Sequence, residues 1–178
     1  ALGDAPDIHC LPVGNAGNIS AYWMGFTEYY HDKVAKQLPQ LWGFQAAGAA
    51  PFVAGHPIEK PETIATAIRI GKPASWDLAV AARDDSGGLI DAVTDDQILD
   101  AYRILADKEG FFVEPSSAAS VAGLLQQASR GLVDAGSTIV CTVTGNGLKD
   151  TQWALESAKD PVVVPVDVKA AAAALGLA

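Results

Sequence analysis

The chain has 178 residues, of which 49% are hydrophobic, and a formal net charge of −9 at pH 7. This length fits one large domain, or a domain and a fragment, and can bury a sizeable core. Because no basic stripe offsets the negative charge, we expect neither a nucleic-acid partner nor a membrane partner.

Other features of the sequence favour a cytoplasmic protein. No signal-peptide pattern opens the chain, and no apolar run reaches transmembrane length. Cys10 and Cys141 each lie in an apolar run, so we expect free thiols in a reducing compartment. The three histidines show no metal-ligand spacing, and no metal site is predicted. The first residue is alanine instead of methionine, which suggests processing or truncation.

Strand and helix patterns alternate through the first half of the chain. Residues 8–13 form an apolar run typical of a buried strand, and residues 19–30 carry aromatic side chains at helical spacing. Residues 41–46 indicate a second buried strand. A helix is expected over residues 61–68, because proline and glutamate stand in its first turn. Ser75 is a candidate N-cap for the next helix.

The second half continues the alternation. Thr94 and Gln97 have the spacing of a capping box at the start of a helix, and another helix is expected from residue 115 to Arg130. Extended segments are expected at residues 89–93, 111–113, 138–143 and 161–165, the last as an edge-type segment before an alanine-rich helix. The continuous apolar run 138–143 is typical of the centre of a parallel sheet. We therefore predict an α/β fold: an open, mostly parallel twisted sheet with helices on both faces.

The turn between the first strand and the first helix is a candidate anion site. It consists of Gly14, Asn15, Ala16, Gly17 and Asn18. A strand, a glycine-containing turn and a helix start direct backbone N–H groups and the helix dipole toward one point. The spacing matches neither the dinucleotide fingerprint nor the P-loop. An ordinary turn whose glycines only reverse the chain is the alternative interpretation.

Two further strand ends carry polar residues, and ligands of open α/β sheets collect at the carboxyl ends of strands. Thr144 follows a buried strand directly, where its hydroxyl can contact a ring nitrogen. Glu114 follows two phenylalanines, so we expect it to be partly buried and either paired or protonated. Each residue, and likewise Ser116 and Ser117, has a simpler interpretation as part of a helix start.

Several long motifs, in order and through essentially the whole chain, resemble the bacterial threonine synthases. They are PVGNAGNI (residues 12–19), QAAGAAP (45–51), PETIATAIRIG (61–71), VEPSSAAS (113–120) and VTGNGLKD (143–150). The resemblance implies a fold-type-II enzyme that uses pyridoxal 5′-phosphate (PLP). Such an enzyme is a cytoplasmic homodimeric lyase of threonine biosynthesis, and it converts O-phospho-L-homoserine and water to L-threonine and phosphate.

The resemblance also implies roles for the candidate residues. Residues 14–18 would hold the cofactor phosphate, and Thr144 would face the pyridine nitrogen. A neutral hydroxyl at that place keeps the nitrogen unprotonated. Glu114 belongs to the expected cofactor-binding set, with its role left open.

One departure from the family pattern limits these expectations. The lysine that forms the Schiff base lies in a Ser-Phe-Lys-Asp type motif, and no lysine here has that context, including Lys149 in Gly-Leu-Lys-Asp. We therefore expect residues 1–178 to be the C-terminal part of the large, cofactor-binding domain, with no catalytic residue and no activity alone. The alternatives are a serine/threonine dehydratase-like enzyme and a non-catalytic anion-binding domain of the same fold.

Overall fold

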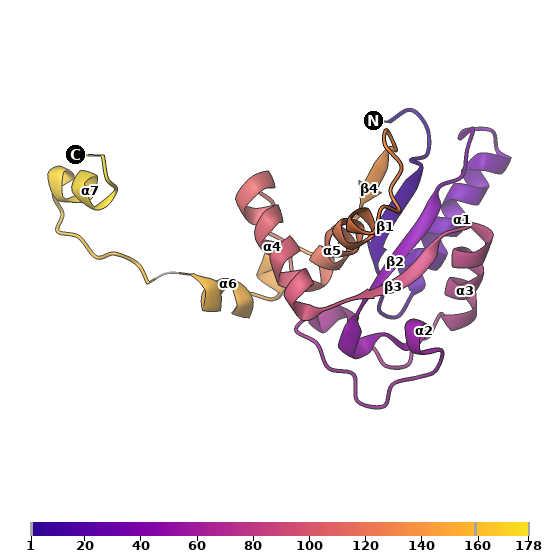
Figure 1. The fold of residues 1–178 in the computed structure, drawn as a ribbon. Coiled ribbons are helices and arrows are strands. Elements are labelled where there is room, and N and C mark those ends of the chain that lie inside the picture. Colours follow the sequence, from indigo (N-terminus) through magenta and orange to yellow (C-terminus); the bar gives the residue numbers. More distant parts are fainter. Residues whose placement is uncertain (1, 159, 178) are drawn as a thin grey trace.

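The computed structural model describes residues 2–158 and 160–177. Its centre is a sheet of parallel strands in the order β3-β2-β1-β4 (Figure 1). The strands are β1 (Ile8–Pro12), β2 (Gln40–Ala46), β3 (Leu89–Val93) and β4 (Ile139–Cys141). Since the strands are parallel, their carboxyl ends meet at one edge, the lower end of the sheet in Figure 1.

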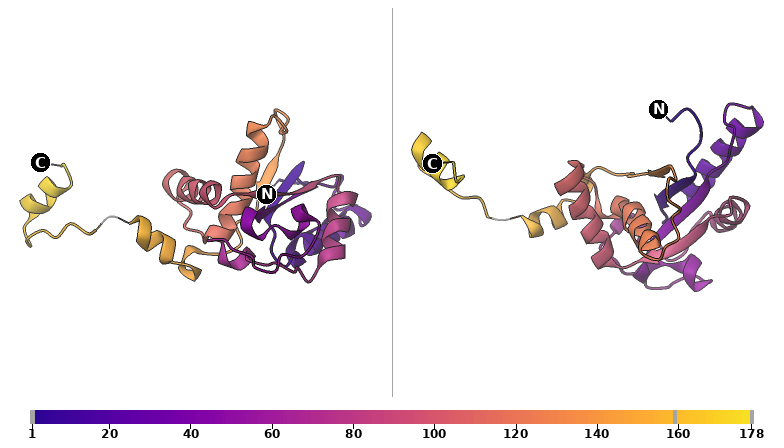
Figure 2. Two further views of the ribbon diagram at one scale, coloured as in Figure 1. Left: turned by 60° about the horizontal axis from the view of Figure 1, so that its bottom comes forward. Right: turned by 45° about the horizontal axis from the view of Figure 1, so that its top comes forward.

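Helices cover both faces of the sheet, as predicted (Figure 2). Helices α1 and α3 pack on one face, and α4 and α5 pack on the other. The helices are α1 (Gly17–His31), α2 (Pro51–Ala54), α3 (Trp76–Asp85), α4 (Asp95–Glu109), α5 (Pro115–Ser129), α6 (Gln152–Ser157) and α7 (Val168–Ala174). Short 3₁₀ helices lie at Ala47–Ala49, Thr66–Ile68 and Gly147–Lys149. The predicted α/β architecture is confirmed.

Alternating side chains of the strands form two separate cores. Cys10 and Phe44 belong to the core beneath α4 and α5, whereas Leu11 and Leu41 belong to the core beneath α1 and α3. On α5, the space over Gly123 is filled by the Phe44 ring, so a Cβ atom at this position would overlap the ring. Glycine therefore lets α5 lie close to the sheet.

The prediction of a central strand at residues 138–143 is wrong. Strand β4 spans only Ile139–Cys141, is half-buried, and pairs with β1 alone among the described residues, which places it at the edge of the sheet. Its Ile139 and Cys141 side chains pack against the core beneath α5. An apolar run indicates that a strand is covered by helices. It does not indicate whether the strand has a neighbouring strand on one side or on both sides.

The helix expected over residues 61–68 is also absent from the structure, where only Thr66–Ile68 forms a 3₁₀ turn. The backbone of this segment makes its hydrogen bonds with distant residues instead of within a helix. The Glu62 N–H donates to the Gly48 carbonyl at 3.0 Å, and the Ala67 N–H donates to Ser116 Oγ at 3.0 Å. Tertiary partners have replaced the local i to i−4 bonds that the sequence suggested.

Three smaller expectations also differ from the structure. Residues 111–113 form no strand; Val113 makes an isolated bridge with Asn146, while Phe111 is 57% exposed. The described residues 161–165 form no strand either. Helix α3 begins after Ser75, as expected, but the Ser75 side chain makes no capping bond. The capping box of Thr94 with Gln97 is confirmed.

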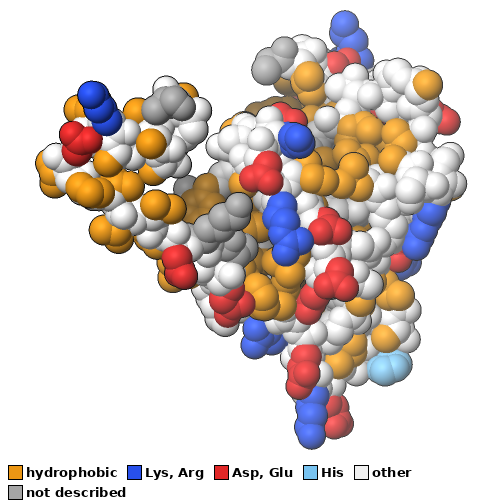
Figure 3. Space-filling view, turned by 60° about the vertical axis from the view of Figure 1, so that its left-hand side comes forward, with side chains coloured by type: hydrophobic (Ala, Val, Ile, Leu, Met, Phe, Trp, Pro, Cys, Tyr) orange, Lys and Arg blue, Asp and Glu red, His pale blue; other side chains and the backbone are white. Residues whose placement is uncertain are grey.

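The C-terminal part of the chain leads away from the sheet. Helix α7 lies apart from the other elements in Figures 1 and 2, and Val162, Val163 and Val166 are exposed. On the face shown in Figure 3, hydrophobic side chains gather on this part, whereas acidic and basic side chains are interspersed over the body. None of the described helices is both long enough and apolar enough to cross a membrane.

Candidate cofactor site

The structure brings the three predicted polar segments together at one edge of the sheet. The turn 14–18 follows β1, and Thr144 follows the neighbouring parallel strand β4. Glu114 joins them because its backbone N–H donates to the Gly145 carbonyl at 3.0 Å. Residues that are far apart in the sequence thus converge where open parallel sheets bind ligands.

The turn 14–18 presents backbone donors. Ala16 has a φ of 66°, in the left-handed region, and α1 begins at the next residue, Gly17. Among the described residues, the backbone N–H groups of residues 15–18 have no hydrogen-bond acceptor. Asn15 and Gly17 are exposed, so these donors are open to a ligand. A group of convergent, unpaired N–H groups at a helix start favours an anion with several oxygens.

The asparagine side chains of the turn hold its shape. Asn18 Nδ2 donates to the Pro12 carbonyl at 2.6 Å. Asn15 Oδ1 accepts from the Ala74 N–H at 3.1 Å, and the Asn15 carbonyl accepts from the Ser75 N–H at 3.2 Å. The left-handed position belongs to Ala16, although asparagine tolerates this conformation better. Both asparagines therefore tie the turn to the rest of the fold.

The two glycines of the turn, Gly14 and Gly17, differ in how much space the structure leaves for a side chain. A Cβ atom on Gly14 would lie 3.0 Å from Ile68 Cα and 3.1 Å from the Ala67 carbonyl oxygen, so packing requires glycine there. A Cβ atom on Gly17 would meet only Ser75 Oγ, at 3.9 Å. The surrounding side chains therefore leave space beside Gly17.

Thr144 is exposed and is held by a buried partner. Its Oγ1 lies 3.0 Å from Oγ of Ser117, which is fully buried in the first turn of α5. Ser117 Oγ also accepts from the Gly145 N–H at 2.7 Å. The sequence suggested Ser117 only as a helix cap. Its contact with Thr144 was missed because nothing local links two residues that are 27 positions apart.

Glu114 is buried and paired, which confirms the first of its two expected states. Its carboxylate lies 3.7 Å from Lys149 Nζ and fills the space next to Gly145, where a Cβ atom would overlap it. The side chain makes no capping bond at the start of α5. The carboxylate thus positions the turn that carries Thr144. A contact between Glu114 and a cofactor stays a prediction.

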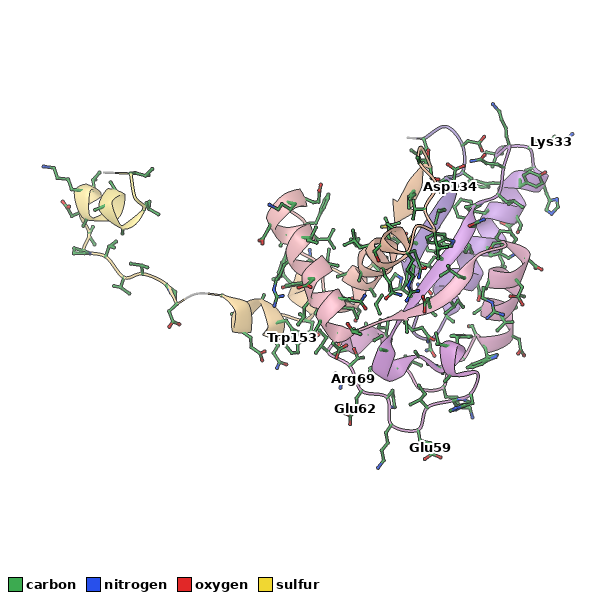
Figure 4. The ribbon with its side chains drawn as sticks, viewed as in Figure 1. Lys33, Glu59, Glu62, Arg69, Asp134 and Trp153 are labelled. Carbon is green, nitrogen blue, oxygen red and sulfur yellow. The ribbon has the colours of Figure 1, made fainter. Side chains whose placement is uncertain are left out.

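The segment Thr66–Ile68 connects these parts. Gly14 packs on Ile68, the Ala67 N–H binds the Ser116 hydroxyl of α5, and Thr66 Oγ1 donates to Asp150 Oδ2 at 3.1 Å. Residues 61–64 before this segment and Arg69 after it line a groove together with Gln152 and Trp153 of α6. Figure 4 shows Glu62, Arg69 and Trp153 near this groove at the lower edge of the molecule. The groove lies outside the set of residues that the sequence predicted.

His9 lies on the α1 face of the sheet as a structural residue. Its Nε2 is 2.6 Å from Thr142 Oγ1, and its ring meets the Tyr22 and Phe26 rings edge-on. Burial lowers the pKa of His9 to about 4, so the ring is neutral at pH 7. The described residues hold no cluster of three or more potential metal ligands.

The neutral state of His9 makes the stability of the chain depend on pH. The pKa of His9 is about 4 in the folded chain and 6.5 for an unperturbed histidine side chain, so the unfolded chain binds more protons between these values. We expect the contribution of His9 to the free energy of unfolding to be complete above about pH 6.5 and to be lost toward pH 4, with a size on the order of 3 kcal/mol. His9→Gln should reduce this slope in urea unfolding between pH 5 and pH 7.5. The exposed His31→Gln is the matched control; an equal slope in both variants would contradict the assignment.

Comparison with known families now gives these geometrical observations a chemical context. The family described as "Pyridoxal-phosphate dependent enzyme" matches residues 1–145. This chain belongs to that family. The matched region contains the turn 14–18, Glu114 and Thr144, and therefore all the residues predicted to bind a cofactor.

Curated relatives with the name threonine synthase match almost the whole chain. The protein of Mycobacterium leprae is 58% identical over 177 residues, which are 99% of this chain and 49% of that protein. The protein of Halalkalibacterium halodurans is 57% identical over 171 residues, 96% of this chain and 48% of its own length. The chain thus spans about half the length of the curated relatives that it matches.

Solved structures show the same fold at lower identity. A threonine deaminase from T.th. has a TM-score of 0.64 and is 21% identical, covering 80% of this chain and 50% of that chain. A fungal L-serine ammonia-lyase from Rhizomucor miehei has a TM-score of 0.65 and is 26% identical, covering 79% of this chain and 45% of that chain. The architecture is therefore that of the fold-type-II PLP enzymes.

Proposed function

We propose that this chain is the C-terminal part of a PLP-dependent threonine synthase. The complete enzyme converts O-phospho-L-homoserine and water to L-threonine and inorganic phosphate. The identity of 56–58% to threonine synthases of several bacteria supports this reaction over others of the family. The structural observation that carries the proposal is the row of unpaired N–H groups at residues 15–18, beside a strand end with the exposed hydroxyl of Thr144.

The residues of this edge fit a phosphorylated pyridine ring. The backbone of residues 14–18 would hold the phosphate, since its N–H groups at residues 15–18 have no acceptor among the described residues. The Thr144 hydroxyl would be the partner of the ring nitrogen, and Glu114 positions the turn that carries Thr144. PLP, when bound, supplies an electron sink that stabilises carbanions next to the substrate nitrogen. A neutral hydroxyl partner leaves the ring nitrogen unprotonated and moderates this sink.

The covalent anchor lies outside this chain in our proposal. PLP enzymes hold their cofactor through a lysine amine, and no lysine here has the sequence context of that residue. Residues 1–178 then form the C-terminal portion of the cofactor-binding domain of a cytoplasmic homodimer. The chain itself contributes the phosphate turn and the partner of the ring nitrogen.

Two other functions are weaker candidates. A serine or threonine dehydratase has the same fold, and solved relatives of that kind align with this chain, but at 21–26% identity. A non-catalytic anion-binding domain would use the turn 14–18 alone and would give the Thr144 hydroxyl no ligand to contact.

An assay of the complete protein separates these three functions. With PLP, the threonine synthase should release phosphate from O-phospho-L-homoserine and form L-threonine in equal amount. A dehydratase would release ammonia from L-serine or L-threonine without phosphate. A binding domain would do neither. Ammonia release with no phosphate release would overturn the proposed reaction.

A further inference from the structure

The Ser117 hydroxyl has a restricted set of hydrogen-bond partners. It is fully buried, and one lone pair of its Oγ accepts from the Gly145 N–H at 2.7 Å. Its own proton can reach two acceptors, Thr144 Oγ1 at 3.0 Å and the Gly145 carbonyl at 3.4 Å. The Gly145 carbonyl also accepts from the Glu114 N–H at 3.0 Å, whereas Thr144 Oγ1 accepts no other hydrogen bond from the described residues. The geometry allows either hydroxyl to donate, and we assign the Ser117 proton to Thr144 because this contact is the shorter of the two.

This direction determines which way the Thr144 proton points. A hydroxyl group has one proton, and Thr144 Oγ1 uses a lone pair to accept from Ser117. The Thr144 proton is then free to point away from α5, and the exposed side of Thr144 is open to a ligand. If Thr144 instead donated to Ser117, it would present a lone pair to that ligand. These two arrangements favour opposite protonation states of a ring nitrogen in contact with Thr144.

We propose that Ser117 is a positioning residue that fixes the Thr144 hydroxyl as a hydrogen-bond donor and so keeps the cofactor ring nitrogen unprotonated. This inference rests on the proposed function, which places that nitrogen at Thr144. Ser117 touches neither cofactor nor substrate and acts only through Thr144. Its place in the first turn of α5 ties the polarity of the site to a helix that packs on the core.

The substitution Ser117→Ala removes this constraint. The Thr144 hydroxyl can then rotate and accept a proton from the ring nitrogen, which stabilises the protonated ring. In the complete protein loaded with PLP that carries ¹⁵N in the ring, the ¹⁵N chemical shift reports protonation directly. We expect the pH midpoint for ring protonation to rise by about one unit, a tenfold gain in proton affinity. A residue that merely supports packing would not move this midpoint.

The controls separate three explanations. Ser120→Ala removes another fully buried hydroxyl of α5, one that donates to the Ser117 carbonyl at 3.0 Å, and should leave the midpoint unchanged. Ser117→Cys keeps nearly the same volume with a weak donor and should give an intermediate midpoint. Thr144→Val should change the ¹⁵N shift itself, because it removes the hydrogen bond to the ring.

Each outcome decides one question. A wild-type midpoint in Ser117→Ala overturns the role of Ser117. If Ser117→Ala does not retain PLP, the midpoint for ring protonation in Ser117→Cys decides instead, and a wild-type midpoint there overturns the role of Ser117. Loss of PLP from both variants also overturns the inference, because the inference requires that the ring stays bound. An unchanged ¹⁵N shift in Thr144→Val shows instead that Thr144 does not contact the ring, and the failure then lies in the proposed site.

Discussion

Replacing Gly17 by valine should abolish retention of PLP by the complete protein while its fold stays intact. Outside its own turn of helix, a Cβ atom at Gly17 would meet only Ser75 Oγ, at 3.9 Å, so the fold tolerates a side chain there. The added side chain would stand within the turn whose N–H groups at residues 15–18 have no acceptor among the described residues, and we expect it to obstruct an anion at this turn. We expect the affinity for PLP to fall by about 100-fold or more, which corresponds to about 2.7 kcal/mol.

The measurement is PLP absorbance after gel filtration, together with thermal unfolding. Gly25→Val is the matched control, because Gly25 lies in the same helix and its Cβ atom would meet nothing within 4 Å. Gly14→Ala gives the opposite pattern: it should lower the thermal stability, since its Cβ atom would press on the backbone of Ile68. If Gly17→Val retained PLP fully, the turn 14–18 would not be part of the cofactor site.

The 178-residue chain by itself should have no threonine synthase activity. The turn 14–18 and Thr144 can be correctly placed in this chain. A complex of this chain with PLP would still lack the lysine amine that holds the cofactor covalently and transfers protons during the reaction. PLP should therefore bind this chain weakly, through the turn 14–18 and contacts to the ring.

Borohydride reduction tests this expectation. The purified chain is mixed with PLP, reduced and digested, and labelled lysines are mapped by mass spectrometry. We expect scattered, substoichiometric labels on exposed lysines such as Lys149, and no phosphate release from O-phospho-L-homoserine. One stoichiometric label together with phosphate release would place the catalytic lysine within this chain.

Local patterns predicted the elements whose burial or end signals lie in adjacent residues of the sequence. The apolar runs of β1 and β2, the aromatic helix α1 and the Thr94 capping box lie close to their expected bounds. The segment 61–68 has good helix-start residues, but its N–H groups find partners at Gly48 and Ser116, and no local pattern contains this information. Residues 138–143 were misplaced because coverage by α5 produces the same apolar run at an edge as in the centre.

The sequence predicted the separate segments of the candidate site, but it did not predict the hydrogen bonds that join them. Glycines and a polar residue at strand ends indicated the turn 14–18 and Thr144 separately, and parallel strands then bring such ends to one edge. The expectation that Glu114 is buried was correct, but the phenylalanines on which it was based are exposed, and Glu114 is buried instead against Gly145. The bond between Ser117 and Thr144 could not be expected, because a serine in a first helical turn has an adequate local explanation as a cap.

The left-handed backbone of Ala16 gives the turn 14–18 a defined shape without any bound anion. A residue other than glycine in this conformation costs about 1 kcal/mol, and here it is retained because the Ala16 methyl group is buried in the core beneath α1. The bonds of Asn15 and Asn18 restrict the same turn from both sides. If this turn binds the cofactor phosphate, as we propose, little conformational entropy would be lost on binding, and most of the energy of the new hydrogen bonds would contribute to affinity.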